Sequence, residues 1–512
     1  MRLFSKAVKK HRASAETLAD AVGRPGPRGW RGRGGGRVNR VRVVEEWEAT
    51  SNQVCGLWPF PSGSGLPVAG IPLGHHLETA ATVCGDPVSW FLANLISNPS
   101  AFVLGRPGLG KSSLIRHMCV IYPAWGINPV ILSDSKGEHV DLIEAIGGEA
   151  IHLGRGIGSL NVLDLGVSAE ELSGLDERAA QRVMADLRAS RENVIVALME
   201  LVSGKPMTDA ARNVVTTALA VVDDEVTGRP PVISDLEDVI DSAHDRVRQT
   251  VRDRGDMNRY RDRTEGVLDA LVSIGARGQF GSVFAEPTTR EMPTDRPVVF
   301  DVSSVEENDL TLLAALQIST WTYASSRLLV ASEQAKAGII PERTPVMVVD
   351  EMWRMFKAAE VMVLRVDALS RLNRQRGLGQ IQCTHTMKDL KMSTEALTET
   401  AWGLVERAGM VFLGGLAPNE MGNLASAFSL SERESSTLIR WSQKGGHDPI
   451  TGAAAAPPGR GQFLLKTGDD PGIPFRVELT DLELHLNDTN KRWHSLQAAR
   501  SQQRRATAAG VA

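Results

Sequence analysis

Residues 101–113 read AFVLGRPGLGKSS, and this stretch decides what kind of fold the chain adopts. Its first four residues are apolar, as in a buried strand, and residues 114–122 continue with apolar side chains at helical spacing. Between them stands GxxxxGK followed by serine, the glycine-rich loop that joins a strand to a helix in phosphate-binding proteins. The backbone N–H groups of such a loop and the positive end of the helix dipole attract phosphate oxygens. The sequence therefore predicts a phosphate-binding loop.

Seven residues of this loop are expected to bind a nucleotide. Its glycines allow the backbone to curl, the Lys111 ammonium reaches the terminal phosphates, and the Ser112 hydroxyl is a ligand for Mg²⁺. The predicted binding residues are Gly105, Gly108, Leu109, Gly110, Lys111, Ser112 and Ser113.

A second apolar run, residues 345–349, ends in Asp350 and Glu351. We expect Asp350 to bind Mg²⁺ and Glu351 to orient or deprotonate the attacking water, because phosphoryl transfer depends on positioning and charge stabilisation. A second carboxylate directly after the Mg²⁺-binding aspartate favours ATP hydrolysis over a GTPase switch. No guanine-reading NKxD motif follows a strand, so ATP is the expected nucleotide.

Two other strand ends carry polar residues. Thr384 and His385 end the strand predicted at 380–384, where His385 is a catalytic candidate that senses the terminal phosphate or the attacking water, or else simply ends a strand. The segment DSKGE at 134–138 follows another predicted strand, and its acid and lysine could touch Mg²⁺ or tie the sheet edge together. Spacing alone does not choose between these roles.

Arginines end the helix that apolar spacing predicts over about residues 352–374. One of them could reach the nucleotide of a neighbouring subunit as a trans-acting finger, which raises phosphoryl-transfer rates by orders of magnitude. The alternative is a solvated basic helix end that complements the helix dipole. The candidates are Arg371, Arg374 and Arg376, with Arg374 as the first choice for a catalytic residue.

Apolar strands alternate with helices over most of the chain, which predicts an α/β fold with a mostly parallel sheet covered by helices. Between about 169 and 278 the pattern is helical with few strand signals, so this block is interpreted as an insertion. The predicted parts are a basic, disordered tail at 1–45, a small β-rich lead-in at 46–100, the nucleotide-binding core at 101–165 and 279–495, a helical insertion at 166–278, and a disordered tail at 496–512.

Composition limits the partners and the setting. Residues 1–44 carry twelve Lys or Arg against two acids, a net charge of +10, whereas the whole 512-residue chain carries −4. Such a segment binds DNA or an acidic membrane surface, unless it is a solvated tail without a partner. The four cysteines form no CxxC pair, and no apolar run approaches the ~18 residues of a spanning helix. We therefore expect a cytoplasmic protein whose membrane association, if any, is peripheral at the inner face.

An ordered series of motifs covers roughly residues 55–495: GRPGLGKS, LSDSKGEHVDLIEAIGGEAIHL with NVLD after it, GQFGSVF, VMVVDEMW, RLNRQRGLGQIQCTH, GQFLLKTGDDPGIPFRVELTDLE and NDTNKRW. The series resembles the conjugative type IV secretion ATPases of the VirB/TraC lineage, within the HerA–FtsK group of P-loop motors. This resemblance implies a RecA-like P-loop NTPase core with an inserted all-helical subdomain. It also implies ATP hydrolysis in a hexameric ring or a precursor of one, at the cytoplasmic base of a DNA or protein transfer apparatus.

The resemblance also carries over to single positions. Lys111-Ser112 matches the phosphate-loop pair of that family, and Asp350-Glu351 matches its acidic pair. Thr384-His385 stands where the family usually has Thr-Gln, so this chain departs from the family by a histidine, which can hydrogen-bond a phosphate or a water.

Three functional hypotheses follow. The first is an ATP-hydrolysing homo-oligomeric motor, expected as a hexamer, that works with membrane-embedded channel components. The second is a DNA translocase or coupling-type ATPase, which loses ground because coupling proteins usually carry N-terminal spanning helices. The third is a nucleotide-binding scaffold without turnover, against which the intact Lys111 and Glu351 argue.

Overall fold

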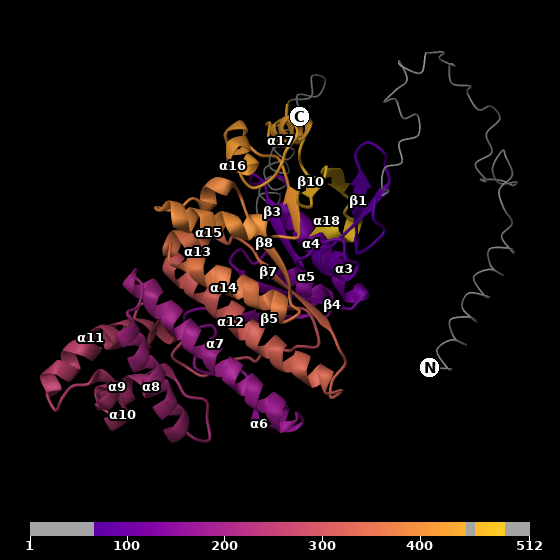
Figure 1. Ribbon diagram of the computed structural model, residues 1–512. Coiled ribbons are helices and arrows are strands. Elements are labelled where there is room, and N and C mark those ends of the chain that lie inside the picture. The colour runs from indigo at the N-terminus through magenta and orange to yellow at the C-terminus, as the bar shows by residue number, and fades with distance from the viewer. Residues whose placement is uncertain (1–65, 447–455, 487–512) are drawn as a thin grey trace, which may run out of the picture. The chain divides into compact units, whose positions relative to one another are not determined.

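The computed structural model describes residues 66–446 and 456–486, so the tails predicted at 1–45 and 496–512 lie outside the described residues. The described chain forms an eleven-stranded sheet in the order β2–β1–β11–β10–β9–β3–β8–β7–β4–β6–β5 (Figure 1). The strands are β1 Pro72–His76, β2 Thr82–Cys84, β3 Ser100–Leu104, β4 Ile127–Asp134, β5 Glu149–His152, β6 Val298–Asp301, β7 Thr344–Val349, β8 Gly379–Thr384, β9 Met410–Leu413, β10 Gln462–Lys466 and β11 Ile473–Val477.

The part of the sheet from β9 to β5 is parallel, and helices cover both of its faces. Every residue of β4 and of β8 is buried, as expected for parallel strands covered on both sides. Successive side chains of β3 point to opposite faces: Val103 joins a core that includes α4 and α5, whereas Phe102 joins a core that includes α12. The helices that cover the sheet are α3 Pro87–Leu92, α4 Lys111–Ile121, α5 Val140–Ala145, α12 Leu310–Lys336, α13 Trp353–Ala358, α14 Met362–Gln375 and α15 Glu395–Glu406.

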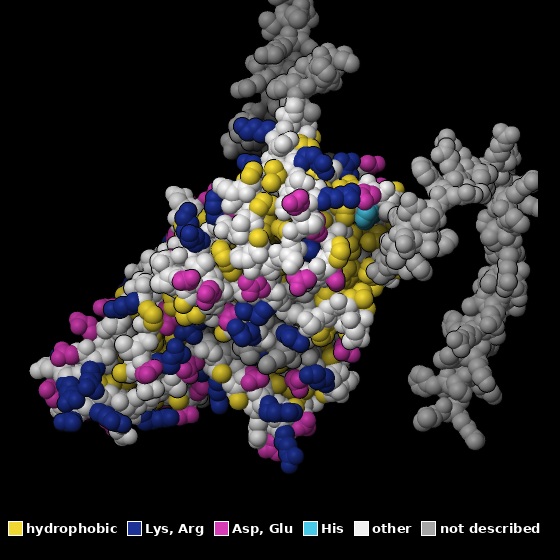
Figure 2. All heavy atoms as spheres, turned by 45° about the horizontal axis from the view of Figure 1, so that its top comes forward, with side chains coloured by type: hydrophobic (Ala, Val, Ile, Leu, Met, Phe, Trp, Pro, Cys, Tyr) yellow, Lys and Arg dark blue, Asp and Glu magenta, His cyan; other side chains and the backbone are white. Residues whose placement is uncertain are grey.

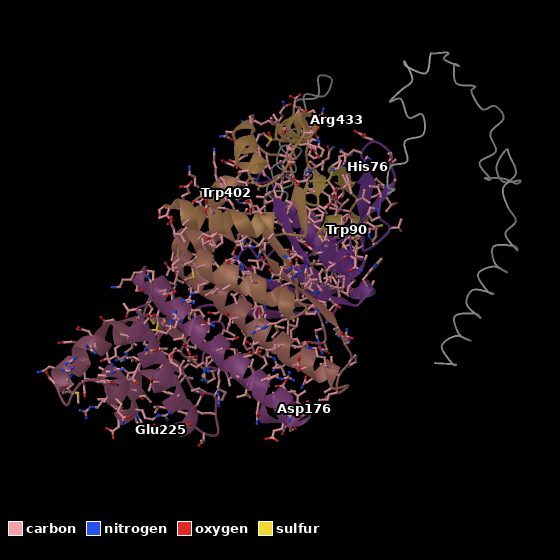
Figure 3. The ribbon with its side chains drawn as sticks, viewed as in Figure 1. His76, Trp90, Asp176, Glu225, Trp402 and Arg433 are labelled. Carbon is pink, nitrogen blue, oxygen red and sulfur yellow. The ribbon has the colours of Figure 1, made fainter. Side chains whose placement is uncertain are left out.

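The stretch between β5 and β6 contains six α-helices among the described residues, and no strand. Side chains of Asp176, Thr208 and Asp256 accept N–H groups in the first turns of three of them, which explains where those helices begin (Asp176 is labelled in Figure 3). The long helix α7 packs against α12, and Figure 2 shows acidic and basic side chains interspersed on the insertion surface. The helices are α6 Ala169–Ser173, α7 Glu177–Ser203, α8 Asp209–Glu225, α9 Ile233–Asp241, α10 Asp245–Val251 and α11 Met257–Ile274.

The other end of the sheet is antiparallel and joins distant parts of the chain. β10 pairs with β9, and β10 and β11 pair with each other as an antiparallel hairpin. β1, from the predicted lead-in, pairs with β11, so that Gly74 lies opposite Val477. Helices α16 Met421–Ala425, α17 Glu432–Trp441 and α18 Asp481–Leu486 belong to this part of the chain.

One expected element is different in the structure. The single helix predicted over about 352–374 is two helices, α13 and α14. The break lies at Ala359, whose φ of −155° and ψ of 120° are extended rather than helical. Apolar spacing predicts both helices but does not reveal the break, because alanine is itself a good helix former.

Candidate nucleotide-binding site

The predicted phosphate loop connects β3 to α4 and leaves the start of that helix open. Gly108 and Gly110 have φ of 79° and 102°, a left-handed region that glycine reaches without steric cost. Gly110 is the residue that precedes α4, and no side chain caps the helix. The first-turn N–H groups of a helix have no partner inside it and bind anions readily. The loop therefore has the backbone of an anion site.

Neighbouring strand ends fix where the loop begins. The Gly105 N–H donates to the His385 carbonyl at 3.1 Å, and the Arg106 N–H donates to the Gly415 carbonyl at 3.1 Å. The loop is thus anchored beside the ends of β8 and β9, which are the two strands that pair with β3.

Lys111 is buried, and its ammonium has two described partners. Its Nζ donates to the Gly105 carbonyl at 2.7 Å and lies 2.9 Å from Nδ1 of His385. A lysine ammonium has no acceptor, so Nδ1 must accept, and a neutral ring then carries its proton on Nε2. That Nε2 lies 3.2 Å from Oε2 of Glu351. His385 therefore bridges the phosphate-loop lysine and the predicted catalytic carboxylate.

Glu351 is held in an unusual conformation by side chains from three elements. Its φ of 52° is left-handed, which is uncommon for a residue with a Cβ. Its Oε1 accepts from Nζ of Lys136 at 2.5 Å, and its Oε2 accepts from the indole N–H of Trp353 at 2.5 Å. Burial raises the pKa of Glu351, but the hydrogen bonds from His385 and Lys136 outweigh it and hold that pKa well below the usual range. The Glu351 carboxylate is thus ionised, and both of its oxygens accept hydrogen bonds.

Lys136 is a residue of this site whose role the sequence left open. It belongs to the segment 134–138, where the buried Asp134 accepts the backbone N–H groups of residues 136, 138 and 139 and so shapes the loop. Burial by itself lowers the pKa of Lys136, but the hydrogen bond and charge of Glu351 raise it overall. Asp134 therefore organises the loop, whereas Lys136 pairs with Glu351. A lysine at a strand end was the signal in the sequence that could have identified Lys136. Trp353 lies shortly after the acidic pair, and nothing in the sequence indicated a role for it.

The predicted Mg²⁺ ligands fit such an ion by chemistry and by place. Ser112 lies in the first turn of α4, and Asp350 follows β7 at the same edge of the sheet. Within 66–446 and 456–486, no group of three His, Cys, Asp or Glu could hold a metal alone. Mg²⁺ is usually bound through one or two oxygen ligands of the protein plus substrate phosphates, which suits a hydroxyl and a carboxylate. The hydroxyl of the buried Thr384, at the end of β8, has no partner among the described residues, so this edge also offers an unused polar atom.

Arg374 lies away from this cluster. It is exposed in the last turn of α14, shortly before β8 begins at Gly379. The parallel strands end at the opposite edge, and the six residues of β8 span roughly 20 Å. The structure thus brings Lys111, Glu351 and His385 together but leaves Arg374 outside the site of its own chain.

No helix in the described parts of the chain is long and apolar enough to cross a membrane. No family model and no curated protein matches the sequence.

Comparison with solved structures finds similar folds. VirB4 of Thermoanaerobacter pseudethanolicus has 18% sequence identity and a TM-score of 0.59, over 82% of this chain and 100% of that chain. The bacterial conjugative coupling protein TrwB, solved unbound and with ADP and Mg²⁺, has 14% identity and a TM-score of 0.45, over 75% of this chain and 86% of that chain. The likeness to VirB4 confirms the fold that the motif series predicted: this chain has the P-loop NTPase fold, with a mostly parallel sheet and an inserted set of helices.

Proposed function

We propose that this chain is an ATP-hydrolysing motor of a conjugation or type IV secretion apparatus, which powers assembly or the transfer of DNA or protein. The proposal of hydrolysis rests on one observation. Lys111 and Glu351 both contact the imidazole ring of His385. A single ring separates the cation that would hold the terminal phosphates from the carboxylate that would activate water. Phosphoryl transfer depends on positioning the phosphates and the attacking water at one site, and these two groups lie close enough to do so.

The assignment to a secretion or conjugation apparatus is supported by two further observations. The ordered motif series extends over most of the chain, and the fold is similar to that of VirB4 over the whole of that solved chain. We accordingly propose a homo-oligomer, with a hexamer as the expected form, at the cytoplasmic face of a membrane-embedded channel.

Each site residue has a proposed role. The loop N–H groups and Lys111 bind the phosphates of ATP, and Ser112 and Asp350 hold Mg²⁺. When bound, Mg²⁺ supplies neutralisation of phosphate charge. Glu351 orients or deprotonates the attacking water, and His385 positions Lys111 and Glu351. Arg374 would act only on the nucleotide of a neighbouring subunit, because it lies at the opposite edge of its own sheet.

A DNA translocase is the second candidate, and the +10 charge of residues 1–44 favours it. Binding of that segment to DNA would weaken steeply with salt and show little sequence preference. Binding to a membrane would instead require anionic lipid.

Steady-state ATP hydrolysis by the purified full chain tests the proposal. Glu351→Gln is the inactive variant, and Glu399→Gln, an exposed position on α15, is the matched control. Each protein is measured at two concentrations, with and without single- and double-stranded DNA. We expect activity in the wild type and the control, a large loss in Glu351→Gln, and a rise steeper than linear with protein concentration. Mixing Glu351→Gln with Arg374→Ala then tests whether the arginine acts between subunits.

The outcomes separate the hypotheses. Strong stimulation by DNA would favour the translocase. Absence of hydrolysis under every condition would reject the stand-alone motor and leave an ATPase activated by a partner or a nucleotide-binding scaffold.

A further inference from the structure

Both oxygens of the Glu351 carboxylate are occupied in this structure. Lys136 donates to Oε1 at 2.5 Å, whereas Trp353 donates to Oε2 at 2.5 Å and His385 lies 3.2 Å from the same oxygen. A general base needs an accessible lone pair and a pKa near the working pH. The ion pair with Lys136 lowers the basicity of Glu351 and covers one of its oxygens. The carboxylate is therefore restrained rather than ready to activate water.

The backbone gives a second indication of restraint. The left-handed φ of 52° at Glu351 is strained, and such strain persists only where the surroundings fix the residue firmly. Loss of one of its side-chain partners would therefore favour a change in the position of the carboxylate.

Lys136 is the partner that is best placed to leave. Its side chain is 36% exposed, whereas that of Glu351 is 8% exposed, so Lys136 lies on the solvent side of the pair. The loop beneath it is fixed independently: Asp134 accepts its N–H groups, and Gly137, at φ 65°, lies close to Ser303. Movement of the lysine side chain therefore does not require unfolding of the loop.

The charges indicate where Lys136 would go. Lys136, Glu351, His385 and Lys111 form a continuous row of contacts from the end of β4 to the start of α4. A phosphate bound at Lys111 would enter at the other end of this row. A nucleotide triphosphate carries several negative charges, so it competes effectively with a single carboxylate for an ammonium.

We propose that Lys136 is an exchangeable positioning residue, which holds Glu351 before nucleotide binds and transfers to the terminal phosphate of a bound triphosphate. This inference rests on the proposed ATP hydrolysis and adds a residue that distinguishes triphosphate from diphosphate. ADP lacks the γ-phosphate, so Lys136 stays on Glu351 when ADP is bound. With ATP the carboxylate is released to act on water.

Nucleotide binding without turnover tests the exchange. The dissociation constants of the non-hydrolysable analogue AMP-PNP and of ADP are measured by calorimetry for wild type, Lys136→Met and Lys136→Arg. Lys205→Met, an exposed lysine between α7 and α8, is the control. We expect Lys136→Met to weaken AMP-PNP binding by roughly 10- to 100-fold, the value of a charge-assisted hydrogen bond, and to leave ADP binding unchanged. Lys136→Arg should retain most of the preference for the triphosphate.

A second variant guards against misfolding. Because Lys136→Met leaves Glu351 buried without its cation, the double variant Lys136→Met/Glu351→Gln removes the charge on both sides. The loss of preference for AMP-PNP should persist in this double variant.

Tryptophan fluorescence detects the movement of the Glu351 carboxylate, because Trp353 donates to it. AMP-PNP, but not ADP, should change the tryptophan emission of the wild type, and Trp353→Phe should abolish this change.

The results also separate this inference from the proposed function. Equal weakening of AMP-PNP and ADP binding, or an emission change of the same size with both, would overturn the exchange and leave Lys136 as a fixed structural partner. Turnover of ATP by that same wild type would show that the proposed function still stands. A wild type that binds neither nucleotide would overturn both.

Discussion

Two buried carboxylates of this protein, Glu351 and Glu200, are both paired with a cation, yet they are held in different ways. Glu200 lies within the regular helix α7 and accepts from the backbone N–H of Met207 at 3.1 Å and from the Arg365 guanidinium at 2.7 Å. Glu351 has a strained backbone, and every partner of its carboxylate described above is a side chain. A backbone N–H and a planar guanidinium fix a carboxylate in place, whereas the flexible four-carbon stem of a lysine lets its ammonium rotate away. We therefore expect the charge of Glu351 to serve chemistry and that of Glu200 to serve stability.

The largest difference is expected when each of the two glutamates is replaced by glutamine, which substitutes a neutral amide for the charged carboxylate. Glu351→Gln should lower kcat by about 10²- to 10⁴-fold, more than any loss of folded protein accounts for, because a positioned base is lost. Glu200→Gln should lower stability and leave turnover per folded molecule unchanged. Steady-state ATPase assays and thermal melts measure both. A Glu200→Gln protein that melts like the wild type but has lost turnover would remove the contrast.

The cation of the structural pair should matter next. Arg365→Met leaves Glu200 buried without its partner, and we expect a loss of about 3–5 kcal/mol in the free energy of unfolding, measured by urea denaturation. Arg371→Met on the same helix is the control, because its pair with Asp367 involves an arginine that is 63% exposed. That change should cost less than about 1 kcal/mol. Equal losses in the two variants would contradict the assignment of Glu200 and Arg365 to stability.

Glu483 has both kinds of partner, a side chain and a backbone N–H, and we expect its replacement to have the smallest effect of the three. Its Oε1 lies 2.6 Å from Nδ1 of His117, and its Oε2 accepts the backbone N–H of Thr480 at 2.8 Å. Burial raises the pKa of Glu483, but the hydrogen bonds from His117 and Thr480 outweigh it and leave that pKa below the usual value. A depressed pKa in the folded state stabilises the fold above the ordinary glutamate pKa of about 4.3 and loses this effect as pH falls.

Glu483→Gln should therefore cost about 1–3 kcal/mol at pH 7 and flatten the decline in stability below about pH 5. Urea unfolding at a series of pH values measures this. Glu478→Gln is the control, since that carboxylate is 67% exposed beside His75. An unchanged pH dependence in Glu483→Gln would show that its charge does not contribute.

The sequence predicted those parts of the site that are local in the chain. The loop at 105–113 needs glycines, a lysine and a hydroxyl at fixed spacing, and the pair Asp350-Glu351 needs only an apolar strand before it. The apolar runs at 129–133, 297–302 and 380–384 also predict strands, because buried parallel strands are almost continuously apolar. The position of His385 beside Lys111 also follows once β3 and β8 are neighbours.

What could not be predicted depends on side chains that meet across long stretches of sequence. Lys136 and Glu351 are 215 positions apart, and nothing in the spacing of DSKGE indicates which strand end its lysine reaches. The break at Ala359 is a choice between two conformations that alanine adopts readily. The pairing of β1, in the predicted lead-in, with β11 could not be predicted either, because neither segment alone indicates it.

That pairing also bears on how the protein is made. The two paired strands are about 400 residues apart, so synthesis at ~5–20 residues per second separates their emergence from the ribosome by roughly 20–80 s. During this interval β1 and β2 have no partner beyond each other, and an isolated hairpin is only marginally stable in water. The last stage of folding therefore waits for the C-terminal hairpin. Nascent chains that stall before residue 462 therefore expose an unpaired strand edge, which is a template for aggregation.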